Sequence, residues 1–402
     1  AVIGVAKLAH EYRNKFGKDI VIDLLGYRRY GHNEMDEPLV TNPQMYHIIH
    51  KHPTVRNIYG QKLVNENVNQ EAEVKKLDET IFSGMQEAYD RVKELPQTTA
   101  HEIIIPDAVL EGMPELPTGV EEGRLKKINE ELLSWPSDFK AFKKLEKILK
   151  RREEPFKGKG KIDWGHAETL ALATIIQEGN SVRLTGQDAQ RGTFSHRHLV
   201  LHDENTGAEL TPIHYISDAK ASFTVHNSPL TETAVLGYEF GYNLENANSL
   251  TIWEAQYGDF ANMAQVMFDN FISSARSKWG LKSGLVMLLP HGSEGQGSEH
   301  SSARLERYLQ LAAENNWTVA NLSSAANYFH ILRRQAKMLK EDAIRPLIIV
   351  SPKSLLRHPL VGAEVADLTE GKFETIIEQP GLGQQPKKKK KVVFASGKLA
   401  ID

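Results

Sequence analysis

The second half of the chain alternates two patterns of apolar residues. Short apolar runs predict buried strands, and longer segments with apolar residues three or four apart predict helices. The expected strands cover residues 182–184, 250–254, 285–289, 317–322 and 347–350, and the expected helices cover 166–178, 231–244, 260–274, 302–315 and 326–339. Helices that alternate with apolar strands are typical of a parallel sheet covered on both faces. The pattern therefore predicts an α/β fold from residue 163 onward.

The first part of the chain has a different pattern. Residues 2–16 have helical spacing, and the apolar run at 19–26 predicts a buried strand, so the pair resembles half of a βαβ unit. Residues 392–395 predict a strand that opens a further unit, and we therefore expect both ends to cut through domains. Between these ends the expected features are a charged helical region at 54–95, a helical region at 121–149 broken at Pro136, and a linker at 150–161.

Composition narrows the classes of function. The net charge of −3 argues against general nucleic-acid binding, and the absence of cysteine excludes disulfides and thiolate chemistry. No apolar run reaches the roughly 18 residues of a membrane-spanning helix, so we expect no membrane partner. Five consecutive lysines at 387–391 could form a localisation or nucleic-acid patch, but a solvated loop between domains is favoured because the rest of the chain is not basic.

The loop at residues 291–304 combines glycines with two histidines. It follows the expected strand at 285–289 and precedes an expected helix, and His300 stands near the start of that helix. Glycines allow a close approach of the backbone to a ligand, and open α/β sheets bind ligands at the carboxyl ends of their strands. The loop is therefore either part of a binding site, with His291 and His300 as candidates, or a surface loop.

Two further histidine-bearing segments follow expected strands. In residues 26–38, His32 lies near Arg28 and Arg29, which suggests proton donation or anion binding, although a polar turn is the plain alternative. In residues 186–203, His196, His198 and His202 alternate as they would on one face of a strand. Metal binding is one reading, but neighbouring arginines favour contact with an anion or substrate.

Two other segments carry an acid and an aromatic pair. Glu232 is expected in the first turn of a helix, where Thr231 could cap the helix and Glu232 could interact with its dipole. Tyr257 and Phe260 could enclose a flat ring, or could belong to the core. Dinucleotide-binding, Walker and serine-hydrolase motifs are absent from the sequence.

Several long strings of the sequence resemble one family. They are GYRRYGHNEMDEP, GQDAQRGTFSHRH, IWEAQYGDFAN, LLPHGSEGQGSEHSSARLERYLQL and SPKSLLRHPL. They are similar to strings of the thiamine-diphosphate-dependent first component of 2-oxoglutarate dehydrogenase complexes, and the resemblance runs essentially from residue 1 to 402. It implies a transketolase-like fold and oxidative decarboxylation of 2-oxoglutarate in the tricarboxylic acid cycle. The succinyl group would pass to the lipoyl group of the second, succinyltransferase component.

The resemblance also implies an organisation. Residues 1–55 would end a pyrophosphate-binding domain, 56–162 would form a helical connecting region and linker, 163–360 would form the pyrimidine-binding domain, and 361–402 would form a linker and the start of a third domain. The family's site lies between two subunits, so a homodimer is expected. A bacterial cytoplasmic location is favoured, with the mitochondrial matrix as the eukaryotic alternative.

The same resemblance implies roles for the candidate residues. Glu232 matches the acid that activates the cofactor, and Tyr257 and Phe260 match the aromatic positions beside its aminopyrimidine ring. His300 matches an active-site histidine that donates a proton and stabilises charge on the substrate oxygen, and His32 matches a histidine that contacts substrate carboxylate or cofactor. His291 would support the loop, while His196 and His198 are candidates for substrate contact.

The sequence departs from the family in one respect. The Gly-Asp-Gly motif that holds magnesium and the cofactor diphosphate is absent, and the only Asn-Asn pair, Asn315-Asn316, follows the wrong element. We therefore expect the magnesium ligands outside this chain, and no decarboxylation by these residues alone. Two alternatives stay open at this stage: action on a related acid such as 2-oxoadipate, and a non-catalytic chain that only binds partners.

Overall fold

The computed structural model describes residues 2–95, 103–294, 296–378 and 391–402. These residues form two compact units, which divide after His101. The predicted lysine-rich stretch lies almost wholly outside the described residues, since only Lys391 belongs to them. Among the described helices, none combines the length and apolar character needed to cross a membrane.

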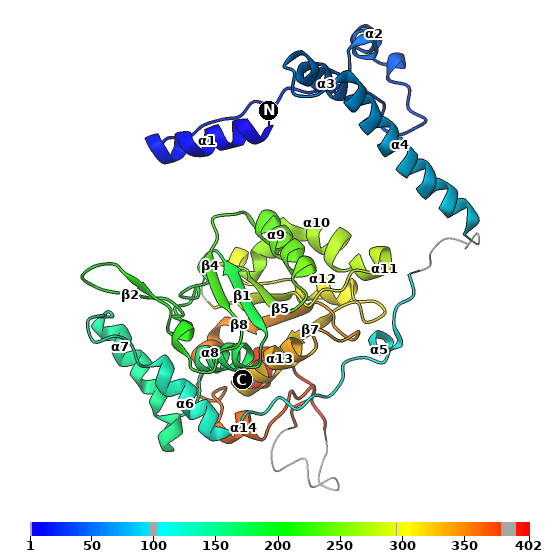
Figure 1. Ribbon diagram of the computed structural model, residues 1–402. Coiled ribbons are helices and arrows are strands. Elements are labelled where there is room, and N and C mark those ends of the chain that lie inside the picture. Colours follow the sequence, from blue (N-terminus) through cyan, green and yellow to red (C-terminus); the bar gives the residue numbers. More distant parts are fainter. Residues whose placement is uncertain (1, 96–102, 295, 379–390) are drawn as a thin grey trace. The chain divides into compact units, whose positions relative to one another are not determined.

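The first unit is helical. Its helices are α1 (Val2–Phe16), α2 (Pro43–Lys51), α3 (Val55–Asn65) and α4 (Glu71–Glu94), as Figure 1 shows. The predicted helices at 2–16 and within 54–95 are confirmed. The predicted strand at 19–26 is wrong: the segment belongs to no helix or strand and pairs with no strand in the described part of the unit, and Val21 and Leu24 are 89% and 80% exposed. An apolar run becomes a strand only where a neighbouring strand satisfies its backbone groups.

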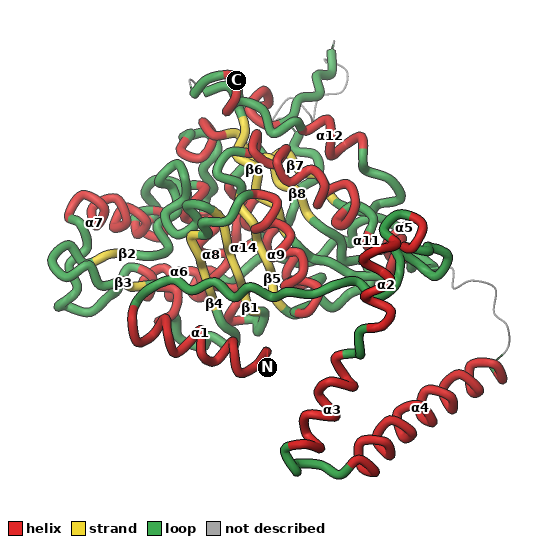
Figure 2. The backbone as a smooth tube through the Cα atoms, turned by 90° about the horizontal axis from the view of Figure 1, so that it is seen from above, coloured by secondary structure: helices red, strands yellow, loops and turns green. Residues whose placement is uncertain are grey.

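The second unit contains a parallel sheet of six strands, with the order β4-β1-β5-β6-β8-β7. The strands are β1 (Ser181–Gly186), β4 (Phe223–Asn227), β5 (Ser249–Glu254), β6 (Val286–His291), β7 (Thr318–Asn321) and β8 (Leu347–Pro352). Figure 2 shows these strands surrounded by helices. The predicted α/β fold is confirmed, although β4 was not predicted.

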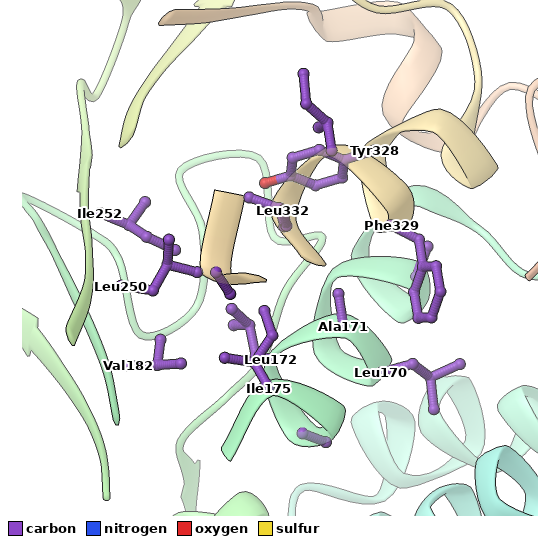
Figure 3. Packing of buried hydrophobic residues seen from close by; sticks show 14 of the residues in the cluster. Leu170, Ala171, Leu172, Ile175, Val182, Leu250, Ile252, Tyr328, Phe329 and Leu332 are labelled. Carbon is purple, nitrogen blue, oxygen red and sulfur yellow. The ribbon is translucent and has the colours of Figure 1, made fainter. Parts of the chain in front are cut away.

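Successive strand residues pack into two different cores. Leu250 and Ile252 of β5 face α8 (Trp164–Gln177) and α13 (Ala325–Lys337), whereas Trp253 of the same strand faces the core of α9 (Glu232–Glu245). Figure 3 shows α8 and α13 side chains packed beside Val182 and Ile252. Because alternate residues of a strand point to opposite faces, a strand buried on both sides carries apolar residues toward both cores.

Short helices complete the second unit. The predicted helix at 260–274 is a 3-10 turn (Gly258–Ala264), α10 (Gln265–Met267) and a π-helical turn (Phe268–Ile272), and the one at 302–315 shortens to α12 (Leu305–Gln310). The other helices are α5 (Asp107–Leu110), α6 (Glu122–Leu132), α7 (Lys143–Lys150), α11 (Ala275–Trp279) and α14 (Val365–Thr369). A two-stranded antiparallel ladder joins β2 (Leu201–His202) to β3 (Glu209–Leu210).

Two other predicted segments differ from expectation. Residues 151–157, expected within a linker, form two packed 3-10 turns, because Arg152 donates a hydrogen bond to the Arg197 carbonyl and Pro155 is buried. The predicted strand at 392–395 is wrong, since these residues are exposed and pair with no strand in the described part of the chain. The predicted domain boundaries at 55, 162 and 360 stay predictions.

We predict that Leu172→Ala lowers the free energy of unfolding of the second unit by about 2–5 kcal/mol, because it leaves a cavity in a close-packed core. Leu172 is fully buried on α8 between the sheet and α13. Urea unfolding followed by tryptophan fluorescence measures this unit alone, since all five tryptophans lie within residues 102–402. Leu360→Ala is the matched control, because Leu360 is 69% exposed. An equal effect of the two substitutions would contradict the assigned core.

Candidate active site

The carboxyl ends of the parallel strands bring several predicted site residues to one edge of the sheet. Glu232 follows β4, Tyr257 and Phe260 follow β5, and His291 ends β6. His300 lies in the loop that leaves β6. All strands of the sheet are parallel, so these ends share an edge, which is where α/β sheets bind ligands.

Glu232 begins α9 and is buried, with 6% of its surface exposed. Its Oε1 atom accepts a hydrogen bond of 3.2 Å from Gln187 Nε2, which follows β1. Thr231 stands at the N-cap position as predicted, but its side chain makes no capping hydrogen bond. The next residue, Thr233, donates a hydrogen bond to the Met263 carbonyl, so the first turn of α9 packs against the segment that carries Phe260. A buried carboxyl group held on one oxygen can offer the other to a ligand.

His300 packs edge-on against two aromatic rings. Its ring centroid lies 4.5 Å from that of Tyr257 and 5.1 Å from that of Phe260, and the two aromatic rings are 5.7 Å apart. Phe194 lies edge-on to Tyr257 at 5.5 Å. The sequence predicted His300 and the aromatic pair separately, and the fold joins them in one cluster.

The position of His300 in its loop differs from the prediction. His300 ends a 3-10 turn (Ser298–His300), whereas α12 begins at Leu305, so the imidazole is not at a helix start. Gly292 and Gly297 have φ angles of +120° and +92°, which side chains with a Cβ rarely adopt. These turns and the hydrogen bond from Gly292 N to the Ser301 carbonyl, 3.0 Å, fold the loop back on itself.

His291 and Asp259 hold the far end of this loop. His291 Nδ1 accepts a hydrogen bond of 2.9 Å from the Ala303 amide, and Asp259 Oδ2 accepts one of 2.8 Å from the Ser302 amide. Burial lowers the pKa of His291, with Asp259 opposing and Lys353 reinforcing the effect. A neutral imidazole retains the lone pair that the Ala303 bond requires.

Lys353 holds the middle of the loop from the end of β8. Its Nζ donates hydrogen bonds to the His300 carbonyl at 2.6 Å and to Gln296 Oε1 at 2.7 Å. Lys353 was not a predicted site residue. The signal was available, since Lys353 directly follows a strand of the same parallel sheet.

The predicted alternation of His196 and His198 on a strand is wrong. Residues 187–200 form turns, and His198 has a φ of +57°. His196 is 8% exposed, and burial lowers its pKa to about 3, with the Arg197 charge adding to the effect. His198 Nε2 lies 2.9 Å from the Ser195 carbonyl, which indicates a hydrogen bond within the loop.

Arg197 explains why this segment turns inward. Its guanidinium is fully buried and pairs with both oxygens of Glu254, at 2.6 and 2.7 Å, and with Glu168 on α8. Tyr328 of α13 donates a further hydrogen bond to Glu168. Burial lowers the pKa of Arg197, but the two carboxylates outweigh it and raise the pKa well above its usual range. No pattern in the sequence indicates that Arg197 is buried between carboxylates.

His32 belongs to the first unit. Its backbone N–H donates to Asp36 Oδ2 at 2.6 Å, and this bond closes a turn at 31–36. Nearby, Tyr27 Oη lies 3.0 Å from His52 Nδ1, and Arg29 donates to the His52 carbonyl at 2.9 Å. The segment thus forms a local turn tied to the end of α2.

Thiamine diphosphate has a pyrimidine end and a diphosphate end that binds magnesium, and each end can be compared with these residues separately. The buried Glu232 carboxyl fits the polar edge of an aminopyrimidine ring. Tyr257 and Phe260 lie edge-on to each other, at 72° with ring centroids 5.7 Å apart, so they offer single ring faces beside such a ring and do not enclose it between them. Within the described residues, no three His, Cys, Asp or Glu side chains cluster as metal ligands. The pyrimidine end of the cofactor therefore fits residues on this sheet, and no magnesium ligands are assigned.

Comparisons with known proteins agree with this arrangement. Residues 160–359 match the family model of the transketolase pyrimidine-binding domain, and residues 1–101 match that of the dehydrogenase E1 component. The chain is 59% identical over all 402 residues to a 2-oxoglutarate dehydrogenase E1 component of a Geobacillus strain, and 54% identical to that of Bacillus subtilis. It spans 42% and 43% of the lengths of these two relatives.

We predict that the stability of the second unit falls as the pH drops from about 6.5 toward 3, partly because of His196. The unfolded histidine gains a proton near pH 6.5, whereas the folded one stays neutral down to its pKa of about 3. Stability is therefore retained above about pH 6.5 and lost below it, by at most about 1.4 kcal/mol per pH unit for one such group.

His196→Gln should reduce this slope, as measured by urea unfolding at several pH values. His202→Gln, at an exposed position of the same unit, is the control and should leave the slope unchanged. An identical slope for wild type and His196→Gln between pH 6 and 4.5 would show that His196 does not titrate as its burial requires.

Proposed function

Because residues 160–359 belong to the transketolase pyrimidine-binding domain family, we propose that the chain is part of a thiamine-diphosphate-dependent enzyme that decarboxylates 2-oxoglutarate. The succinyl group would pass to a lipoyl group on a succinyltransferase component. The relatives' name as 2-oxoglutarate dehydrogenase E1 components supports this substrate over 2-oxoadipate. The chain spans about two fifths of their length, so the activity is proposed for a full-length polypeptide that contains it.

The buried Glu232 carboxyl is the observation that carries the proposal. It lies at the carboxyl edge of the sheet, where Gln187 binds one of its oxygens. A carboxyl group that is withdrawn from water can share a proton with a ring nitrogen rather than remain fully solvated. We assign Glu232 the role of hydrogen-bonding the aminopyrimidine and thereby activating the cofactor.

Bound thiamine diphosphate would supply a carbon nucleophile and an electron sink. Tyr257 and Phe260 would flank its aminopyrimidine ring. His300, held edge-on against both rings, would donate a proton and stabilise negative charge on the substrate oxygen. His291 would support the loop through Ala303.

The remaining roles concern three further histidines. We assign His32 to the substrate carboxylate or cofactor from the first unit, by resemblance alone. His198 is retained as a candidate for substrate contact, whereas His196 is too deeply buried to reach a substrate without movement of its loop. The proposal also includes magnesium as a cofactor, a homodimeric assembly and a bacterial cytoplasmic location.

We predict that Glu232→Gln in a full-length polypeptide lowers the decarboxylation rate by about 100- to 10,000-fold, the range typical of lost acid–base catalysis. Release of carbon dioxide from 2-oxoglutarate, with thiamine diphosphate and magnesium added, measures it. Proton exchange at the reacting carbon of the cofactor should fall in parallel, because that step precedes substrate binding.

Glu245→Gln is the matched control, since Glu245 is exposed at the other end of α9. It should retain the wild-type rate. Undiminished proton exchange in Glu232→Gln would refute the role of Glu232. Faster wild-type turnover of 2-oxoadipate than of 2-oxoglutarate would instead assign 2-oxoadipate as the substrate. No turnover of either acid would indicate a chain that only binds partners.

A further inference from the structure

Lys353 is a buried cation whose partners all belong to the candidate site. It directly follows β8 and is only 6% exposed. Within the described residues, its ammonium group forms no ion pair with a carboxylate at 4 Å or less, unlike the arginine between Glu168 and Glu254. Its direct partners are instead one carbonyl, one side-chain amide and one aromatic ring.

These three partners converge on His300. Nζ donates a hydrogen bond to the carbonyl of His300 itself, and a second to Gln296 Oε1 four residues earlier. The same ammonium lies 5.2 Å from the ring centroid of Tyr257, against which the His300 imidazole packs. Lys353 thus contacts both the backbone of His300 and one of the rings that orient its side chain.

Around His300 the loop's own hydrogen bonds join Ser301 to Gly292 and Gly297, and Lys353 attaches this part of the loop to the end of β8. His291 and Asp259 bind the amides of Ala303 and Ser302, beyond His300 in the chain. Gly297, between Gln296 and His300, has a φ of +92° and gives the backbone freedom to move. Lys353 therefore supplies the attachment on the near side of His300.

The burial of Lys353 argues that this attachment has a use beyond packing. Removing an ammonium from water is unfavourable, and burial lowers the pKa of Lys353, while Asp259 and Glu294 at longer range oppose the shift. An apolar residue would fill the same space without this penalty. It could not bind the His300 carbonyl.

We propose that Lys353 is a positioning residue for decarboxylation: it fixes His300 against Tyr257 by binding the His300 carbonyl and the Gln296 side chain. The inference rests on the proposed function, since it assigns His300 a part in the reaction. Lys353 itself contacts the loop and the ring, and no contact with the substrate is required.

The test uses a full-length polypeptide that contains this chain. Lys353→Met should lower kcat on the order of 10- to 100-fold, because small misplacements of a catalytic group have effects of that size. KM for 2-oxoglutarate and Kd for thiamine diphosphate should stay within about threefold of the wild type, since a change confined to the transition state lowers kcat without weakening ground-state binding. Lys353→Arg, which keeps a donor and the charge, should restore part of kcat.

Two further variants isolate the mechanism. Lys282→Met is the matched control, because Lys282 is 47% exposed and pairs with Asp342, away from the loop; its kcat should be unchanged. Combining Gln296→Ala with Lys353→Met should reduce kcat by less than the product of the separate effects, since the two residues share one contact.

Amide hydrogen exchange gives a readout that does not depend on turnover. Exchange at residues 296–301 should be faster in Lys353→Met than in wild type or Lys282→Met, because the loop opens more often. Unchanged exchange together with unchanged kcat would overturn the inference. The inference would also be overturned if Lys353→Met lowered both kcat and the thermal midpoint and Lys353→Arg restored neither, because the variant would then have lost its fold in general.

A wild-type polypeptide that turns over no 2-oxoglutarate would refute the proposed function instead, while the exchange result would still decide whether Lys353 holds the loop.

Discussion

The buried guanidinium of Arg197 is the interaction on which the arrangement of the second unit depends most. It connects Glu168 of α8 with Glu254 at the carboxyl end of β5, and Tyr328 of α13 donates a hydrogen bond to Glu168. Leaving either carboxylate without this partner would cost about 3–5 kcal/mol, because an uncompensated charge would remain in the core. The ion cluster also draws residues 187–200 over the edge of the sheet, since Arg197 belongs to that segment and makes no contact with solvent. Helix α8, strand β5 and the segment 187–200 are thus fixed relative to one another by one side chain.

The candidate site follows from the direction of the strands. In a parallel sheet every carboxyl end lies on the same edge, so residues from five strands meet there although they are far apart in the sequence. The apolar strand interiors fix the sheet between its two cores, and the candidate site residues lie mostly after the strands. Glu232, His300 and Lys353 all occupy such positions. Packing therefore sets where the chemistry can be, and side-chain hydrogen bonds set its geometry.

The features that depend on local periodicity were predictable from the sequence, and the features that depend on distant partners were not. The strands at 250–254 and 347–350 and the helix of Glu232 were correct because burial imposes a regular apolar pattern. The strand at 19–26 was wrong because an apolar run does not reveal whether a neighbouring strand is present. β4 was missed because it is an edge strand whose residues are mostly half-buried or exposed. The site residues named from the sequence came largely from resemblance. The contacts of Gln187, Asp259 and Lys353 are evident only in the fold, although the position of Lys353 directly after a strand was a signal that the sequence contains.

The charges around the His300 loop are consistent with its hydrogen bonds. His291 can accept the Ala303 amide only as a neutral imidazole, with its proton on Nε2. Burial lowers the pKa of His291, and the positive charge of Lys353 lowers it further, so the neutral form is favoured at neutral pH. Lys353 donates to both the His300 carbonyl and Gln296, and its protonated form is the stronger donor. The more distant Asp259 and Glu294 favour that form, whereas burial opposes it. Asp259 therefore has two effects on the loop. Its carboxylate accepts a hydrogen bond from the Ser302 amide, and its negative charge favours the protonated form of Lys353. Lys353 thus favours the neutral His291 that the Ala303 bond requires, whereas Asp259 opposes it and favours the charged form of Lys353. Three side chains, those of His291, Asp259 and Lys353, therefore contribute both to the hydrogen bonds of the loop and to its electrostatics.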